Sequence, residues 1–257
     1  MSKSFSSIVR SLLPTGGNAR PSLSSPRPEP QFWHETDQTF LDFYDQSVRQ
    51  TGSEDQRQPF PHRLYNTLQA FCAVADRDGW IAECGCFRGL SAHLISSFQR
   101  HYHKAFTGEG FQVFDSFAGL SDPTDEDMLL VENRLKVGTP ACKAGAYAAT
   151  LEHVRNSLKP FPKIEFHPGW LPESLKPELG KAYKFVHLDL DIYVPIKGAL
   201  EFFYPRLVPG GILVLDDYGF IRWPGARKAT DEFCASRGIR PIVLSTGNAM
   251  LVKAPES

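Results

Sequence analysis

The sequence predicts an α/β protein whose mostly parallel sheet carries helices on both faces. Short apolar runs of strand length alternate with amphipathic helical stretches, as in sheets whose parallel strands are joined by crossover helices. Near its end the chain has two short strands, 242–244 and 249–252, separated by Ser245-Thr246-Gly247-Asn248, which predicts an antiparallel hairpin. With 257 residues and 42% hydrophobic content, the chain is long enough for one sizeable core.

A strand–helix–strand unit is predicted between residues 185 and 215. The runs 185–188 and 212–215 are short and apolar, as buried strands are. The segment between them has apolar residues at helical spacing, namely Ile196, Ala199, Leu200, Phe203 and Leu207. Pro195 suits the first turn of this helix, and Pro209-Gly210-Gly211 ends it. Because a crossover helix joins parallel strands, the carboxyl ends of both strands point the same way.

Acidic residues follow both strands of this unit. Asp189 and Asp191 come after the first strand, and Asp216 and Asp217 come directly after the second. If the strands are neighbours, these ends lie about 5 Å apart. Four carboxylates so close together would repel one another without a cation. The sequence therefore predicts a metal site, and ligands that are all oxygen suit magnesium.

A glycine-rich turn follows the first predicted strand, 80–84. It contains Glu83, Gly85 and Gly89 in the pattern Glu-x-Gly-x-x-x-Gly, and a helix begins after it. The glycines let the backbone approach a ligand, and the first turn of the helix offers free N–H groups and the positive end of its dipole. The dinucleotide fingerprint Gly-x-Gly-x-x-Gly is absent, because Cys86-Phe87 do not supply the second glycine.

The next two strands also end in residues that suit a nucleoside. Asp115 follows the strand 111–114, where a carboxylate can accept hydrogen bonds from ribose hydroxyls; a turn or cap role is the alternative. Trp170 follows the strand 163–166 and either packs on a planar base or belongs to the core. A helix is predicted over 147–159.

The segment 121–146 has no clear periodicity and carries several acids. A connection of this length is unusual inside a compact domain. We expect either a lid over the site or a solvated acidic loop, and the sequence does not separate the two.

The N-terminal part divides into a tail and a helical cap. Residues 1–30 are rich in Ser, Pro, Arg and Gly, which predicts a disordered tail; an organelle transit peptide is the sharper alternative. Residues 31–78 are expected to form a cap of two helices, 36–50 and 59–77, that either covers the sheet or contributes to a substrate pocket. Arg63 lies in the second helix and is interpreted as a surface or capping residue.

Composition excludes several classes of protein. The net charge of −1 argues against a general nucleic-acid binder. No apolar run approaches the roughly 18 residues of a membrane span. The five cysteines form neither a CxxC pair nor a disulfide framework, which predicts reduced thiols in a cytoplasmic protein.

Six motifs in one order resemble the macrocin O-methyltransferase (TylF-type) family. They are ECGCFRG at 83–89, DSFAGL at 115–120, PGWL at 168–171, LDLDIY at 188–193, YPRLVPGG at 204–211 and DDY at 216–218. The resemblance implies a Rossmann-like class I methyltransferase sheet over about 79–257, closed by the antiparallel hairpin. It also implies an S-adenosylmethionine- and magnesium-dependent enzyme that methylates a hydroxyl of a sugar or glycosylated natural product. Members of that family tend to self-associate, so a homo-oligomer is expected.

The resemblance assigns roles to individual residues. It gives Asp189, Asp216 and Asp217 as the expected metal ligands. Apart from the resemblance, Asp191 lies two residues from Asp189 and so points to the same side of the strand, which makes it either the base that takes the hydroxyl proton or a further carboxylate near the metal. Asp189 therefore belongs to both the metal site and the catalytic site. The residues expected at S-adenosylmethionine are Glu83, Gly85, Gly89, Ser91, Asp115, Ser116 and Trp170.

Departures from the family pattern leave alternatives open. Val194-Pro195-Ile196 stand where the family often has Glu-Ser-Thr, and Gly89-Leu90-Ser91 is nearer to catechol-type methyltransferases. The first alternative is therefore a catechol-type enzyme acting on an aromatic diol. The second is a metal-dependent glycosyltransferase that uses Asp189-x-Asp191 as its DxD motif. The third is a module that binds S-adenosylmethionine without turnover.

Overall fold

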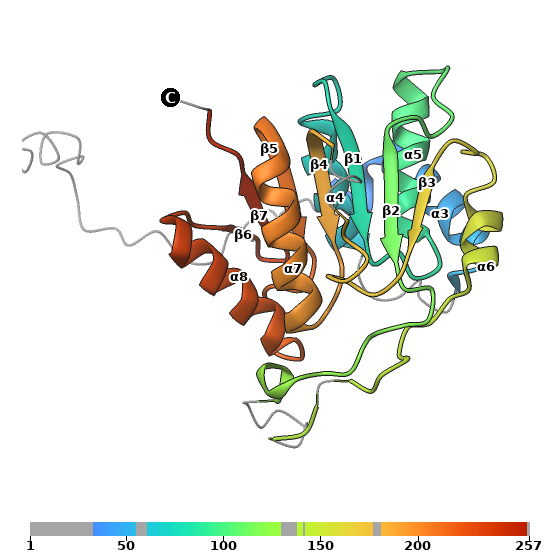
Figure 1. The fold of residues 1–257 in the computed structure, drawn as a ribbon. Coiled ribbons are helices and arrows are strands. Elements are labelled where there is room, and N and C mark those ends of the chain that lie inside the picture. The colour runs from blue at the N-terminus through green and yellow to red at the C-terminus, as the bar shows by residue number, and fades with distance from the viewer. Residues whose placement is uncertain (1–32, 55–60, 130–137, 141, 177–180, 256–257) are drawn as a thin grey trace, which may run out of the picture. The chain divides into compact units, whose positions relative to one another are not determined.

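A computed structural model describes residues 33–54, 61–129, 138–140, 142–176 and 181–255 (Figure 1). The part of the chain from Trp33 onward forms one compact unit. The predicted disordered tail, 1–30, lies outside the described residues. Among the helices described, none has the length and apolar character needed to cross a membrane.

A seven-stranded sheet with the order β3-β2-β1-β4-β5-β7-β6 forms the centre of the fold. Its strands are β1 (Trp80–Cys84), β2 (Phe111–Asp115), β3 (Glu165–Pro168), β4 (Tyr183–Leu188), β5 (Leu207–Leu215), β6 (Ile242–Val243) and β7 (Ala249–Val252). The first five strands in that order are parallel, and the hairpin β6–β7 joins β5 in the antiparallel direction. The predicted mostly parallel sheet with an antiparallel terminal hairpin is confirmed.

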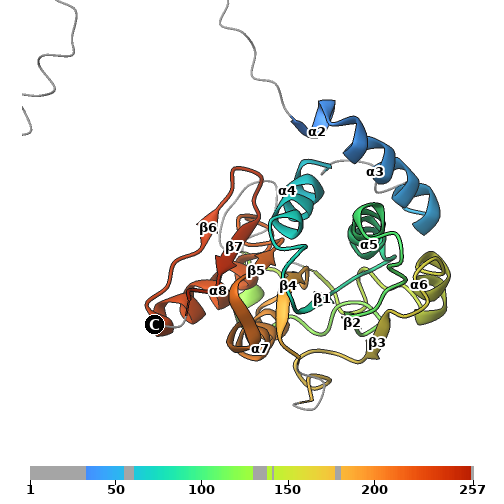
Figure 2. The same cartoon turned by 90° about the horizontal axis from the view of Figure 1, so that it is seen from above.

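Helices cover both faces of the sheet (Figure 2). The helices are α2 (Trp33–Thr36), α3 (Gln38–Thr51), α4 (Pro61–Cys72), α5 (Leu90–Tyr102), α6 (Leu151–Ser157), α7 (Tyr193–Phe203) and α8 (Pro224–Arg237). One apolar cluster joins α3, α4, α5 and α6 to one face of the sheet, and a second joins α7 and α8 to the other. The helices of the predicted cap thus share a core with the sheet.

Several predicted boundaries were wrong for identifiable reasons. The helix expected to reach Leu207 ends at Phe203, because Pro205 has no N–H and the chain tightens into a 3₁₀ turn before β5 begins. The helix predicted from 147 begins at Leu151, where the Thr150 side chain accepts a hydrogen bond from His153 N. Helix α4 ends at Cys72 rather than 77, and β3 lies two residues later than predicted.

The carboxyl ends of the central strands meet at one edge of the sheet. Strands β1 and β4 are neighbours, and the chain proceeds outward from them in opposite directions, so the strand order reverses between them. Backbone bonds continue past the strand ends: Gly85 N donates to Phe114 O, and Asp189 N donates to Cys84 O, both at 2.9 Å. In such folds a ligand site forms at the point of reversal.

The long connection between β2 and α6 is tied down at two places. At its base, Leu120 N donates to Ala146 O at 2.9 Å, and Gly145 N donates to Leu120 O at 2.8 Å. Further out, the buried carboxylate of Asp127 accepts a hydrogen bond of 2.8 Å from Tyr193 N, the first residue of α7. The described part of this connection therefore reaches the segment that carries the predicted catalytic aspartates.

Replacing Asp127 should loosen this attachment. We expect Asp127→Ala to lower the free energy of unfolding by about 1–3 kcal/mol, because it leaves Tyr193 N and Thr124 N without their acceptor. Urea denaturation measures the change. Asp125→Ala is the matched control, since Asp125 is exposed in the same 3₁₀ turn. Equal stability of the two variants would contradict the attachment.

Candidate active site

A cavity of about 380 Å³ opens at the carboxyl edge of the sheet. It collects residues from the ends of β1, β2, β4 and β5, together with the connection after β2 and the start of α4 and α8. The predicted site residues that line it are Gly85, Ser91, Asp115, Ser116, Trp170, Asp189, Asp191, Asp216 and Asp217. Segments far apart in the sequence, from Tyr44 to Trp223, thus contribute to one site, as a switch-point cavity allows.

Gly85 brings the turn after β1 into direct contact with the chain after β4. Its φ is 80°, and a Cβ on it would overlap the main-chain oxygen of Asp189. Only glycine permits both this backbone conformation and this approach. Gly89 has a φ of 89° at the N-cap of α5 and does not line the cavity, so it serves the turn itself.

Asp115 fixes the shape of the glycine turn. Its Oδ2 accepts hydrogen bonds from Cys86 N at 2.7 Å and from Phe87 N at 3.3 Å, and its Oδ1 accepts one from Phe117 N at 2.7 Å. The carboxylate therefore links the ends of β1 and β2. Oδ2 therefore has both lone pairs in use, whereas Oδ1 keeps one with which to accept a further hydrogen bond.

The other predicted cofactor residues fall into two groups. Ser116 Oγ and Trp170 Nε1 both donate to Gly119 O, at 2.7 and 3.1 Å, and the Trp170 side chain is about half exposed at the cavity. Ser91 lies in the first turn of α5. Glu83 differs, because it is fully buried, lies off the cavity lining and pairs with His187, whose Nδ1 is 3.1 Å from its Oε1.

The aspartates converge, but in a different grouping from the one predicted. Asp189, Asp191 and Asp217 each offer a carboxylate oxygen, and these atoms lie within 4.8 Å of one another. Asp191 does not belong to β4, which ends at Leu188, so alternation along a strand does not place it. A left-handed backbone at Asp191, with φ at 60°, turns its N–H toward Asp217 Oδ2 at 3.1 Å.

The three carboxylates are electrostatically unfavourable as they stand. Burial and the charge of Asp217 raise the pKa of Asp189 to about 7. Burial and the charges of Asp217 and Asp189 raise the pKa of Asp191 well above its ordinary value. A divalent cation would reverse both effects, because it would replace mutual repulsion with attraction. The all-oxygen donor set fits magnesium.

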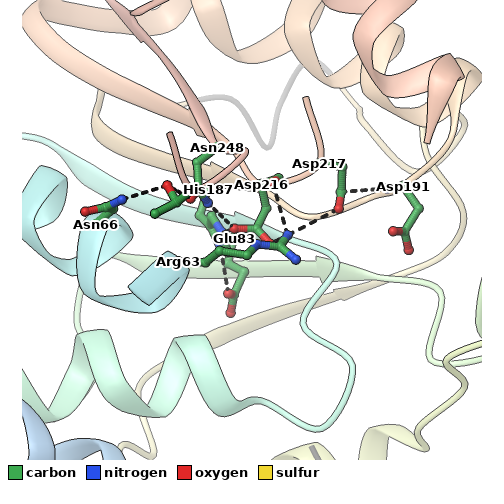
Figure 3. Close-up of polar contacts among 9 residues, drawn as sticks. Arg63, Asn66, Glu83, His187, Asp191, Asp216, Asp217 and Asn248 are labelled. Atoms are coloured by element: carbon green, nitrogen blue, oxygen red, sulfur yellow. Dashed lines mark hydrogen bonds and ion pairs between the residues drawn. The ribbon is translucent and has the colours of Figure 1, made fainter. Parts of the chain in front are cut away.

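Asp216 lies beside this group and is bound from two sides (Figure 3). Arg63, from α4, forms an ion pair with its Oδ2, and Asn248 Nδ2 donates to its Oδ1 at 2.5 Å. The same arginine reaches Asp217 Oδ1 at 3.4 Å. Asn66, one turn after Arg63, donates to Thr246 Oγ1 at 2.8 Å and so links α4 to the terminal hairpin.

Sequence reasoning missed Arg63 and Asn66 as site residues. Arg63 was interpreted as a surface or capping residue, yet its side chain is only 11% exposed. A signal was present: Arg63, Asn66 and the buried Thr67 share one helical face at spacing i, i+3, i+4. The apolar face of the same helix gives a stronger periodic pattern, so the polar face with Arg63 was overlooked.

The fold and the cavity define a Rossmann-like protein of the class I methyltransferase type, and solved structures agree. The O-methyltransferase NovP aligns with a TM-score of 0.60 at 22% identity, over 75% of this chain and 80% of NovP. The calicheamicin methyltransferase CalS11 aligns with a TM-score of 0.61 at 18% identity, over 89% of this chain and 99% of CalS11. At these identities the likeness shows the fold.

The family follows from the sequence comparison. The macrocin-O-methyltransferase (TylF) family matches residues 60–247, and the chain belongs to this family, as its motifs predicted.

Two named relatives are similar over a shorter stretch. One is the 8-demethyl-8-(2,3-dimethoxy-alpha-L-rhamnosyl)-tetracenomycin-C 4'-O-methyltransferase of Streptomyces olivaceus, 29% identical over 63% of this chain. The other is the mycinamicin III 3''-O-methyltransferase of Micromonospora griseorubida, 25% identical over 68% of this chain. The matched stretch spans 60% of the first relative's length and 68% of the second's.

Gly85 offers a test of how the two halves of the cavity are held together. We expect Gly85→Ala to lower the free energy of unfolding by more than about 3 kcal/mol, because the new methyl group would overlap Asp189 O. Gly138→Ala is the matched control: its φ is 74°, but no atom of the residues that the structure describes lies within 4 Å of the added atom. In that variant only backbone strain should lower the free energy of unfolding, by about 1–2 kcal/mol. Thermal denaturation compares them, and equal losses would show that the approach to Asp189 is not tight.

Proposed function

We propose that this chain is an S-adenosylmethionine-dependent O-methyltransferase that methylates a hydroxyl of a sugar-bearing small molecule at a divalent-cation site. The observation that carries the proposal is the shared cavity. A glycine turn and the strand-end acid Asp115, which suit a nucleoside, line the same space as a cluster of carboxylates. Membership of the family supports methyl transfer over the glycosyltransferase alternative.

The names of the relatives support the acceptor class. One relative is named for 4'-O-methylation of a rhamnosyl-tetracenomycin C, and the other for 3''-O-methylation of mycinamicin III. The first of these acceptors carries a sugar by name. The carboxylate cluster of this chain suits such an acceptor, because a divalent cation can bind two neighbouring hydroxyl oxygens at once.

The cofactor end of the cavity would bind the nucleoside of S-adenosylmethionine, whose sulfonium supplies an electrophilic methyl group. Asp115 would accept hydrogen bonds from the ribose hydroxyls, and Ser91 and the first turn of α5 offer polar groups beside them. The Trp170 ring, held by its bond to Gly119 O, would pack against the planar base.

The other end of the cavity would hold the cation and the acceptor. Asp189 and Asp217 are common to the predicted ligand set and to the cluster, and we propose both as ligands. Asp216 is the third proposed ligand, because a cationic guanidinium already joins its carboxylate to that of Asp217. A bound magnesium ion supplies positive charge that holds the acceptor oxygens and lowers the pKa of the reacting hydroxyl.

Asp191 is proposed to take the hydroxyl proton. It lies inside the same ring of carboxylates as Asp189 and Asp217, so a hydroxyl held there is within its reach. The Asp217 Oδ2 atom fixes its main chain at 3.1 Å. This bond and the left-handed turn fix the main chain of Asp191, and its carboxylate faces those of Asp189 and Asp217.

The ligand role of Asp217 can be separated from the base role of Asp191. Manganese serves as the probe, and calorimetry gives its affinity. We expect Asp217→Asn to weaken manganese binding by at least about 30-fold, because a charged ligand is lost, and Asp191→Asn to change it by less than about 5-fold. Asp122→Asn, at an exposed position, is the control. Equal losses at positions 191 and 217 would make Asp191 a ligand instead.

Asp115 can be tested with S-adenosylhomocysteine as the probe. We expect Asp115→Ala to weaken its binding by at least about ten-fold, because hydrogen bonds to a charged acceptor are lost and the glycine turn loses its support. Manganese affinity should not change. Unchanged affinity for S-adenosylhomocysteine would remove Asp115 from the cofactor site. Binding of UDP-glucose in place of S-adenosylhomocysteine by the unmodified protein would overturn methyl transfer.

A further inference from the structure

Arg63 occupies an unusual position for a cation. Its Nη2 forms an ion pair with Asp216 Oδ2, donates to Asp216 O at 3.0 Å and reaches Asp217 Oδ1 at 3.4 Å. The guanidinium carbon also lies 4.3 Å from the centre of the Phe220 ring. All of these contacts are made by a side chain that is 11% exposed, at the edge of the carboxylate cluster.

We propose that Arg63 is an internal counter-cation that competes with the divalent cation for Asp216 and Asp217. In this proposal the guanidinium withdraws from both carboxylates when the cation binds and returns when it leaves. Arg63 thereby sets the affinity of the site for the cation. The inference rests on the cation site of the proposed function and adds a residue outside the predicted ligand set.

Arg63 and a divalent cation carry charge of the same sign. Arginine stays protonated at any pH at which the protein is folded, so its positive charge cannot be removed by a proton shift. Asp217 is shared: one oxygen faces Arg63, while the residue also belongs to the cluster with Asp189 and Asp191. A divalent cation at that cluster and the guanidinium would repel each other across one buried carboxylate.

The surroundings of Arg63 allow it to leave the carboxylates. Asn248 Nδ2 already donates to Asp216 Oδ1, so this carboxylate keeps a neutral partner when the guanidinium departs. Phe220 offers an aromatic face on which the guanidinium stays favourably placed.

The helix that carries Arg63 has its own attachment. Asn66, three residues later, binds Thr246 Oγ1 at 2.8 Å, and Thr246 Oγ1 in turn lies 2.9 Å from Asn248 Oδ1. The start of α4 is therefore held to the terminal hairpin independently of Arg63. In the proposed exchange the Arg63 side chain changes rotamer while the helix stays in place, which is a small and fast motion.

Manganese titration of the full chain tests the proposal. We expect Arg63→Met, which keeps an unbranched side chain about as long as the aliphatic part of arginine but removes the guanidinium charge, to bind manganese at least about ten-fold more tightly than the unmodified protein. Arg63→Lys should stay close to the unmodified protein. Arg88→Met is the matched control: Arg88 lines the same cavity, but its guanidinium donates to Gly52 O at 2.8 Å. The proposal would be overturned if Arg63→Met bound manganese as weakly as the unmodified protein does, or more weakly.

A second pair of variants avoids leaving a buried carboxylate unpaired, which could destabilise Arg63→Met. We compare Asp216→Asn with the double variant Arg63→Met/Asp216→Asn, in which both charges are gone. Competition predicts that the double variant binds manganese at least about ten-fold more tightly than Asp216→Asn, because Arg63 can then no longer neutralise Asp217. Equal manganese affinities of these two variants would overturn the competition. Absence of manganese binding in every protein would overturn the cation site itself, whereas equal binding with and without Arg63 would overturn only the competition.

Discussion

The close approach of carboxylates at the ends of β4 and β5 is the interaction on which the rest of the site depends. Neighbouring strands of a sheet lie roughly 5 Å apart, so the residues that directly follow two such strands are close together. Hydrogen bonds of the main-chain N–H groups of Asp189 and Asp191 keep these residues beside Asp217 despite the repulsion between their carboxylates. The side chain of Arg63 supplies positive charge on one flank.

Main-chain hydrogen bonds explain why this unfavourable arrangement persists. Asp216 N donates to Leu188 O and Asp189 N donates to Cys84 O, each at 2.9 Å, so the backbone of both acidic segments continues the ladder of the sheet. The stability that fixes the carboxylates comes from the two apolar clusters on either side of the sheet, and Leu190 and Tyr218, which adjoin the aspartates, belong to one of them. A large core thus holds an edge at which carboxylates repel one another.

Sequence reasoning predicted the features that depend on local pattern. The alternation of strands and helices, the terminal hairpin and the acidic strand ends follow from periodicity and turn residues, and the structure has them all. The boundaries near Pro205 and Thr150 were missed, because a prolyl turn and a side-chain cap override apolar periodicity. The grouping of the aspartates was not predictable, since it depends on a left-handed residue at Asp191 and on an arginine about 150 residues away in sequence.

The contact between Gly85 and the main-chain oxygen of Asp189 has a consequence for the evolution of this family. The turn proposed to bind the methyl donor and the segment proposed to bind the acceptor meet at the main chain of Gly85 and Asp189, with the Leu190 side chain beside them. The span between donor and acceptor is therefore independent of the side chains around the cavity mouth. Cavity-lining residues such as Tyr147 and Arg222 can diverge to admit new molecules while that span stays constant. A glycine with no side chain would in this way let one scaffold serve many acceptors.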